Sequence, residues 1–274
     1  MQNYEADRNM PVGVFDSGVG GLTVVREISR NLPNEELIYF GDTARVPYGN
    51  KSKETVLRYS RQITRFLEKQ HVKAIVVACN TASALALSEL EQEIDIPIIG
   101  VVKPGANAAV KATRNKRIGV IATDSTINSR LYPEYIAASD PEIRVYGKAC
   151  PLFVPLVEEG WTKDEITLAV AKRYLGELLE QEIDTLIMGC THYPLLRTLL
   201  REYLGEGITL VNPAYETAGT LKALLAETGL EHKDEGEPKY QMYVSDSAEH
   251  FRRFAEKILP ERIADVTQIA IEEY

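Results

Sequence analysis

The residues from Ala74 to Ala84 read Ala-Ile-Val-Val-Ala-Cys-Asn-Thr-Ala-Ser-Ala, and this stretch indicates the fold. Its five leading apolar residues are typical of a short, fully buried strand. The polar trio Cys79-Asn80-Thr81 follows at once, and a segment with helical character, Ala82–Leu90, follows the trio. In open α/β sheets, ligands bind in the crevice at the carboxyl ends of the strands. The trio is therefore predicted to lie at a ligand site.

A second stretch repeats this order. Residues 185–196 read Thr-Leu-Ile-Met-Gly-Cys-Thr-His-Tyr-Pro-Leu-Leu, so that Cys190 stands 111 residues after Cys79. An earlier pair of apolar runs shows a similar offset, because Gly119 stands 106 residues after Gly13. The near-constant offset indicates an internal duplication. Such a duplication would make the two cysteines face each other across a shared cleft.

Apolar strands and amphipathic helices alternate along the chain, which predicts parallel sheets covered on both faces. We expect an α/β protein of two pseudo-symmetric, doubly wound parallel-sheet domains, with the active site in the cleft between them. Residues 1–102 plus 212–274 are predicted to form the first domain and residues 103–211 the second. The expected strands are Pro11–Phe15, Leu37–Phe40, Ala74–Ala78, Ile98–Val101, Arg117–Ala122, Ile143–Gly147, Thr185–Gly189 and Tyr240–Val244. The expected helices are Leu22–Asn31, Ser52–Lys69, Ala82–Leu90, Thr126–Ala138, Lys163–Gln181, Tyr215–Glu227 and Ala248–Ile258.

The composition limits the partners. The net charge is −9 and no run of lysine or arginine is present, which argues against nucleic acid as a main ligand. The apolar runs are far shorter than the ~20 residues that span a bilayer, so no membrane association is expected. Three cysteines without Cys-x-x-Cys spacing indicate free thiols in a reducing compartment, and four scattered histidines give no metal site. We expect a cytoplasmic protein.

The cysteine pair suggests acid–base chemistry. At a helix N-terminus, the dipole and free amides favour the thiolate, so we expect a thiol pKa that falls from ~8.5 toward neutrality. One thiolate and one thiol on opposite sides of a bound carbon acid form a two-base system that inverts the carbon. The alternative reading treats each cysteine as a small buried hydrophobe. The third cysteine, Cys150, has no such polar neighbours and is read as structural.

Polar residues beside the cysteines admit two readings. Asn80-Thr81 and Thr191-His192 could cap helices or capture a substrate carboxylate at helix starts, and both roles can hold together. The turn after the first strand reads Asp16-Ser-Gly-Val-Gly-Gly21 and lacks the third glycine of a dinucleotide fingerprint, so we expect it to expose Asp16 and Ser17.

Three further residues have weaker signals. Tyr48 and the Gly49 amide follow the second strand, where they either form a turn or line the cleft. Glu158 is either a solvated helix residue or a partner of His192.

Five motifs together resemble the glutamate racemase family, within the aspartate/glutamate racemase superfamily. They are Asp16-Ser-Gly-Val-Gly-Gly21, Gly41-Asp42 with Pro47-Tyr-Gly49, Ala78-Cys-Asn-Thr-Ala82, Ala149-Cys-Pro-Leu152 and Gly189-Cys-Thr-His-Tyr-Pro194. The resemblance runs from about Pro11 to the last helix. It implies cofactor-independent interconversion of L- and D-glutamate, which supplies D-glutamate for peptidoglycan, by a protein that is commonly a homodimer.

The resemblance also implies roles for individual residues. Cys79 would take the α-proton of D-glutamate and Cys190 that of L-glutamate, with Asp16, His192 and Glu158 assisting them. The implied substrate contacts are Asp16, Ser17, Tyr48, Gly49, Asn80, Thr81, Thr123, Thr191 and His192. The polar lead Met1–Met10 resembles a short variable extension without a role.

Other functions stay open from the sequence alone. Aspartate racemase is the nearest rival, distinguished by substrate length. A pyridoxal-phosphate racemase would need a Schiff-base lysine, which no motif marks. A two-lobed protein that binds an anionic amino acid without reacting would not need the matched cysteines.

Overall fold

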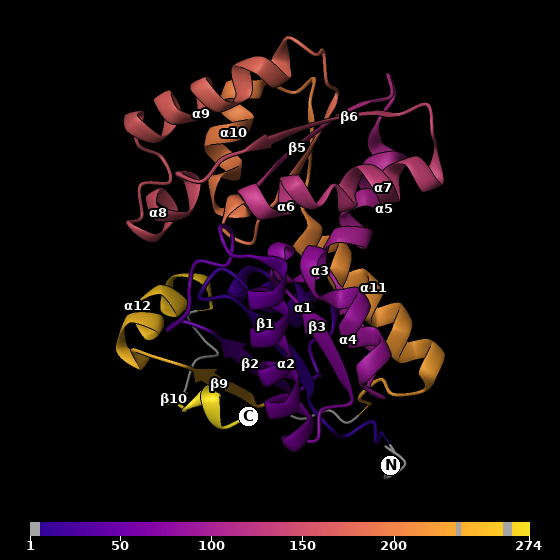
Figure 1. The fold of residues 1–274 in the computed structure, drawn as a ribbon, viewed down its shortest axis with the longest axis vertical. Helices are drawn as coiled ribbons and strands as arrows, with labels where there is room; N and C mark the ends of the chain where they lie inside the picture. Colours follow the sequence, from indigo (N-terminus) through magenta and orange to yellow (C-terminus); the bar gives the residue numbers. More distant parts are fainter. Residues whose placement is uncertain (1–5, 234–236, 260–264) are drawn as a thin grey trace.

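Two parallel β-sheets, each in its own lobe, form the protein in the computed structural model (Figure 1). The structure describes residues 6–233, 237–259 and 265–274. The first five residues of the polar lead lie outside this description, as do residues 234–236 of the polar turn Glu231–Pro238 that is expected after the sixth helix. All strand pairs in both sheets are parallel. The predicted class of two parallel-sheet α/β domains is confirmed.

The two sheets share one strand order. The larger sheet runs β10-β9-β2-β1-β3-β4 and the smaller one runs β6-β5-β7-β8, so each contains its first four strands in the order 2-1-3-4. The strands are β1 (Val12–Asp16), β2 (Leu37–Gly41), β3 (Ala74–Val77), β4 (Ile98–Gly100), β5 (Arg117–Ala122), β6 (Arg144–Ala149), β7 (Thr185–Gly189), β8 (Thr209–Val211), β9 (Tyr240–Val244) and β10 (Val266–Gln268). This repeated topology supports the duplication inferred from the sequence offsets.

The order 2-1-3-4 creates a switch point in each sheet. The chain leaves the first strand toward one edge and then returns to the other side, so a crevice opens between the carboxyl ends of strands one and three. The switch points lie between β1 and β3 in the larger sheet and between β5 and β7 in the smaller one. Cys79 follows β3 and Cys190 follows β7, so both cysteines lie where the topology opens a ligand crevice.

Helices cover both faces of each sheet. The first lobe contains α1 (Leu22–Asn31), α2 (Lys53–Lys69), α3 (Asn80–Leu85), α4 (Leu87–Glu93), α12 (Ala248–Ile258) and the short η2 (Ile271–Glu273). The second contains α6 (Asp124–Ser129), α7 (Leu131–Ser139), α8 (Phe153–Glu158), α9 (Glu165–Leu179), η1 (Tyr193–Leu196) and α10 (Arg197–Leu204). Two connecting helices, α5 (Val102–Ala112) and α11 (Pro213–Thr228), pack against each other beside the lobes. Figure 1 shows α6 of one lobe next to α3 of the other, and these helices are in contact.

The C-terminal strands belong to the sheet of the first lobe. Strand β9 pairs with β2, and β10 extends the same edge of the sheet. The exact domain bounds at residues 102/103 and 211/212 remain a proposal, because they fall at the two connecting helices. In the described part of the chain, no helix is both long enough and apolar enough to cross a membrane.

Two expected helices are each divided. The segment predicted as Ala82–Leu90 forms α3 and α4, with a break at Ala86. The segment predicted as Thr126–Ala138 forms α6 and α7, which are separated by Arg130 in the left-handed conformation (φ 60°). The sequence pattern did not predict α5, α8, β8 or β10. Helix α8 and strands β8 and β10 are short, so a helical or alternating apolar pattern has too few residues to be recognised. Helix α5 contains Pro104 and Gly105, which are poor helix formers.

A buried ion pair anchors the amino end of the first sheet. The Lys73 ammonium lies 2.6 Å from the Glu35 carboxylate and donates to the Arg8 carbonyl at 2.6 Å. Glu35 also accepts from the His232 amide at 2.8 Å. Both side chains of the pair are almost fully buried, at 0% and 2% exposed. The pair therefore ties two distant chain segments to the start of β3.

We predict that Lys73→Met destabilises the protein by about 3–5 kcal/mol, because the Glu35 carboxylate would stay buried without its cation. The double variant Lys73→Met/Glu35→Leu should recover most of this loss. Urea unfolding followed by circular dichroism measures both. The exposed Lys53–Glu89 pair, at 2.6 Å, provides the control, and Lys53→Met should cost less than about 1 kcal/mol. Equal losses for the two single variants would contradict the prediction.

Candidate active site

Each switch point contributes one half of the candidate site. From the first lobe come Asp16, the last residue of β1, Ser17 after it, and the trio Cys79-Asn80-Thr81 after β3. From the second come Thr123 after β5, and the trio Cys190-Thr191-His192 after β7. The two cysteines are 5% and 7% exposed, and Asp16 is fully buried. The structure therefore brings the predicted residues of both halves together at the interface of the lobes.

Cys79 lies at the start of α3 as its N-cap. Its sulfur accepts from the Ala82 amide at 3.4 Å, and its thiol donates to the Ser17 hydroxyl at 3.7 Å. Burial, together with the negative charge of Asp16, raises the pKa of Cys79 to about 12. The expectation that the helix N-terminus lowers this pKa toward neutrality is wrong. One backbone amide of the six-residue helix α3 stabilises the thiolate. Desolvation and the neighbouring Asp16 carboxylate destabilise it by more, so the pKa rises.

Cys190 begins a chain of polar contacts that reaches the surface. Its sulfur lies 3.8 Å from Nδ1 of His192, and Nε2 of the same ring lies 2.9 Å from Oε1 of Glu158. Burial lowers the pKa of His192, but hydrogen bonds and charge interactions with Cys190 and Glu158 outweigh burial and raise the pKa to about 10. At neutral pH the imidazole is therefore charged. Of the two readings of Glu158, the structure favours the partner of His192.

Asp16 is held by backbone amides on one side only. Its Oδ2 accepts from the amides of Gly21 at 2.9 Å and Gly18 at 3.3 Å. Its Oδ1 is buried without a hydrogen-bond partner among the described residues. Burial raises the pKa of Asp16, whereas the charge of His192 and the backbone amides lower it. One carboxylate oxygen thus remains available for a donor from a ligand.

The polar residues after the cysteines do not cap helices with their side chains. The N-cap of α3 is Cys79, and His192 at the start of η1 makes no side-chain cap. Asn80 and Thr81 direct their polar groups to the second lobe instead. The Asn80 Oδ1 accepts from the Tyr132 hydroxyl at 2.7 Å, and the Thr81 hydroxyl lies 2.9 Å from that of Thr123. The capping interpretation is therefore wrong for these side chains.

Hydroxyl groups join the two lobes at three further points. Thr126 completes a triangle with Thr81 and Thr123, at 3.2 Å and 2.9 Å. Ser125 donates to the Gly49 carbonyl at 2.8 Å. Thr23 of α1 donates to the Thr191 carbonyl at 2.8 Å. The interface around the site is thus polar.

Glycines permit the close approach of the lobes. A Cβ at Gly20 would lie 2.4 Å from the Thr191 hydroxyl, and one at Gly49 would lie 2.7 Å from Cβ of Thr123. Both distances are shorter than real Cβ contacts, so only glycine fits at these positions without a shift of the partner lobe.

Tyr48 is engaged elsewhere. Its hydroxyl donates to the Asp42 carboxylate, which also binds Arg45 and the Ser245 hydroxyl. Its ring is 1% exposed. The first lobe therefore presents the backbone around Gly49, rather than the Tyr48 phenol, to Thr123.

Cys150 differs from the other two cysteines. Burial raises its pKa, and its thiol donates to the Lys148 carbonyl at 3.6 Å. Its own carbonyl accepts from the Tyr193 hydroxyl at 2.8 Å. These backbone contacts agree with the structural role read from the sequence.

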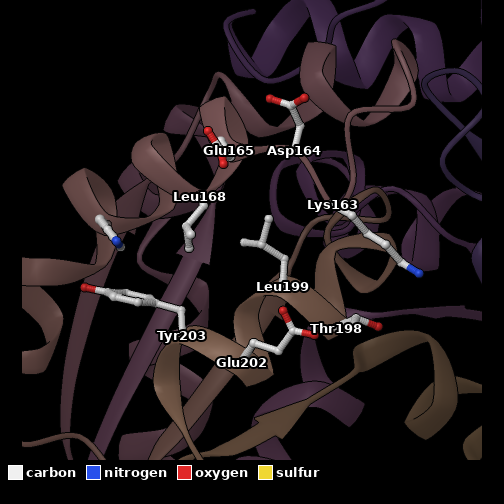
Figure 2. Close-up of a pocket in the computed structure, with 9 residues that line it drawn as sticks. Lys163, Asp164, Glu165, Leu168, Thr198, Leu199, Glu202 and Tyr203 are labelled. Atoms are coloured by element: carbon white, nitrogen blue, oxygen red, sulfur yellow. The ribbon is translucent and has the colours of Figure 1, made fainter.

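A separate pocket of about 390 Å³ lies between α9 and α10 of the second lobe (Figure 2). Leu168 and Leu199 lie near its centre, and the carboxylates of Asp164, Glu165 and Glu202 surround them. All of its lining residues come from these two helices and the turn before α9. The pocket is therefore distinct from the paired cysteines.

Known proteins match the chain over most of its length. The family model Asp/Glu/Hydantoin racemase matches residues 12–220. The chain belongs to this family.

Glutamate racemases are among its relatives at 44–49% identity. That of Geobacter metallireducens is 49% identical over 261 residues, which cover 95% of this chain and 97% of the relative. The crystal structure of glutamate racemase isoform RacE1 from Bacillus anthracis is 40% identical, with a TM-score of 0.92 over 96% of this chain and 98% of that one. The structure from Francisella tularensis in complex with D-glutamate is 39% identical, with a TM-score of 0.91 over 97% of this chain and 100% of that one. The resemblance to the glutamate racemases is confirmed, and the chain is an isomerase of this group.

The structure adds residues that the sequence analysis missed. Tyr132, Thr126, Ser125 and Thr23 all make polar contacts with the site from neighbouring helices. Each is an ordinary helix residue in the sequence, and no spacing marks it. The offset between the repeats does not reveal these residues either. They lie outside the repeated strand ends and make contacts between the lobes.

Proposed function

We propose that the protein interconverts L- and D-glutamate without a cofactor, through proton transfer by Cys79 and Cys190. The observation that carries the proposal is the arrangement of two buried thiols at equivalent strand ends of two lobes. Each has its own acid–base neighbour, Asp16 for Cys79 and the His192–Glu158 pair for Cys190. The charge of Cys190 contributes to the raised pKa of Cys79, so the two sulfurs are within electrostatic range. A protein that only bound glutamate would not need such a pair.

The protonation states of the two sites indicate which substrate enantiomer the resting form would act on. Cys79 carries its proton at neutral pH, since its pKa is raised to about 12. The imidazolium of His192 lies beside Cys190, so its positive charge faces that sulfur. Cys190 as thiolate would take the α-proton of L-glutamate, and the electron pair of the broken C–H bond would enter the carboxylate as an enediolate. Cys79 would then give its proton to the opposite face of the carbon, which yields D-glutamate.

The next turnover needs the protons to return. After conversion of L-glutamate, Cys190 holds a proton and Cys79 is a thiolate, which is the form that acts on D-glutamate. In the reverse reaction, Cys79 removes the α-proton and Cys190 supplies the new one. Exchange with solvent between turnovers restores the first form without D-glutamate. The asymmetric environments of the two sulfurs therefore support opposite roles for them.

Substrate charges match the remaining groups. The free Oδ1 of Asp16 suits the α-ammonium, with Ser17 beside it. Donors for the α-carboxylate are available from the Asn80 amide, the hydroxyls of Thr81 and Thr123, and Thr191. Hydrogen bonds to this carboxylate strengthen as negative charge develops on it, which lowers the barrier to proton removal. The Gly49 backbone and Tyr48 would complete the wall on the side of the first lobe.

We predict that the wild-type protein converts L-glutamate in D2O into D-glutamate with deuterium at Cα. Cys79→Ser and Cys190→Ser should each lower racemisation by about 10³-fold or more, because a serine hydroxyl is a much weaker acid–base group near neutral pH. Cys150→Ser is the matched control and should retain near wild-type turnover. Chiral chromatography with mass spectrometry measures product and label.

Unlabelled, unchanged glutamate with the wild-type protein would refute the proposed reaction. Retained activity in either site variant would refute the two-base mechanism while keeping the reaction.

The His192–Glu158 pair predicts a pH effect. Because the pKa of His192 in the folded protein is raised above its ordinary 6.5, the charged ring contributes stability that is complete below about pH 6.5. This contribution is lost as the pH rises through about 10. The same loss of charge removes the positive charge that lies beside the Cys190 sulfur.

Glu158→Gln should move the alkaline limb of kcat/KM for L-glutamate to lower pH, because it removes the negative charge that holds the His192 proton. The pH profile between 6 and 11 measures the limb. Glu159→Gln changes an adjacent exposed carboxylate and should leave the limb in place. An unshifted limb in Glu158→Gln, or equal shifts in both variants, would contradict the role of Glu158.

Parts of the proposal rest on the family resemblance. They are a cytoplasmic role in the supply of D-glutamate for peptidoglycan and cell shape, and assembly as a homodimer. Exposed apolar side chains such as Trp161 (43% exposed) support a contact between copies. Rescue of a bacterial strain that requires D-glutamate tests the role, and sedimentation at twice the chain mass of 30.6 kDa tests the dimer. Failed rescue by an active enzyme, or a stable monomer, would overturn the respective part.

A further inference from the structure

Tyr132 is a buried tyrosine that the proposed chemistry does not use. It is the second residue of α7 in the second lobe, and it is 1% exposed. Its hydroxyl donates across the lobe interface to Oδ1 of Asn80 at 2.7 Å. Asn80 itself is 4% exposed and directly follows Cys79. The hydrogen bond therefore connects α7 to the turn that carries the first catalytic cysteine.

A glycine makes room for the Tyr132 ring. A Cβ at Gly189 would lie 3.1 Å from Cε2 of the ring, which is closer than most real Cβ contacts. Gly189 immediately precedes Cys190, so the ring packs against the backbone of the second cysteine turn. Asn80 and Cys190 also line one small cavity of about 10 Å³. Tyr132 thus contacts both cysteine turns at once.

The hydrogen bond fixes the orientation of the Asn80 amide. A primary amide has one acceptor end and one donor end, which exchange places when the group turns over. Burial raises the pKa of the Tyr132 phenol, so it keeps its proton and donates. Because the donor from Tyr132 occupies Oδ1, the amide nitrogen is held at the opposite end. Among the described residues the structure gives this nitrogen no hydrogen-bond partner.

We infer that Tyr132 is a positioning residue that holds the Asn80 amide with its N–H donors toward the substrate carboxylate. The inference rests on the proposed function, in which Asn80 binds that carboxylate. Without the phenol hydroxyl, the amide would turn freely and present its oxygen to an anion for part of the time. Tyr132 acts through Asn80 and does not touch the substrate.

The decisive experiment is a double-mutant cycle on Tyr132 and Asn80 with glutamate binding as the readout. Tyr132→Phe, which removes only the hydroxyl, should weaken D-glutamate binding and raise KM by about tenfold, with kcat changed by less than about twofold. In the Asn80→Ala background, Tyr132→Phe should have no further effect on Kd. Isothermal titration calorimetry measures Kd for all four proteins in a Cys190→Ser background, in which the titrated D-glutamate is not racemised, so the cycle does not depend on turnover.

Tyr193→Phe is the matched control. Tyr193 is also fully buried in the second lobe, and its hydroxyl donates to a backbone carbonyl, that of Cys150, at 2.8 Å. The control should lower the melting temperature much as Tyr132→Phe does, while Kd for D-glutamate stays within twofold of the wild-type value. This comparison separates a loss of stability from a loss of orientation.

Three results would overturn the inference. They are an unchanged Kd in Tyr132→Phe, an equal loss of binding with and without Asn80, and an equal loss in Tyr193→Phe. A wild-type protein that binds D-glutamate but does not racemise it would refute the proposed function alone. The cycle would then still decide the role of Tyr132.

Discussion

The burial of Cys79 beside Asp16 is the constraint on which the chemistry depends. Two acidic groups share a region with little water, and two negative charges cannot both be stabilised there. Backbone amides bind the Asp16 carboxylate, and the pKa of Cys79 is raised to about 12. A protonated Cys79 follows from this arrangement, and so does the need for a different environment around Cys190. The imidazolium of His192 supplies it.

The fold is symmetric, but the site is not. Ser17 in the first repeat corresponds to Thr123 in the second, and Asn80 corresponds to Thr191. Polar groups therefore recur at the equivalent strand ends. The charged groups do not recur. Asp16 corresponds to Ala122, and His192 corresponds to Thr81. Duplication therefore explains where the two thiols lie, whereas the differences between the repeats explain why the two thiols have different charged neighbours.

Sequence reasoning predicted the parts of the site that depend on local pattern. A short apolar strand followed by a polar trio is visible in eleven residues, and strand order then determines which ends meet. It did not predict Tyr132, and it gave the contact between Glu158 and His192 only as one of two readings of Glu158. Both contacts depend on how helices far apart in the chain pack together. The sequence also did not predict the raised pKa of Cys79. Helix position is readable from sequence, but the degree of burial that opposes the helix dipole is a property of the assembled lobes.

The chemistry of the lobe interface explains how one site can be built from two lobes. Apolar groups at this interface would leave a substrate carboxylate without donors, and charged groups would need partners before the substrate arrives. Hydroxyls avoid both problems because each can donate or accept. Thr81, Thr123 and Thr126 satisfy one another across the interface, and their hydrogen atoms can rotate toward an anion without movement of the backbone. The interface that holds the lobes together thus already contains the donors that a carboxylate requires.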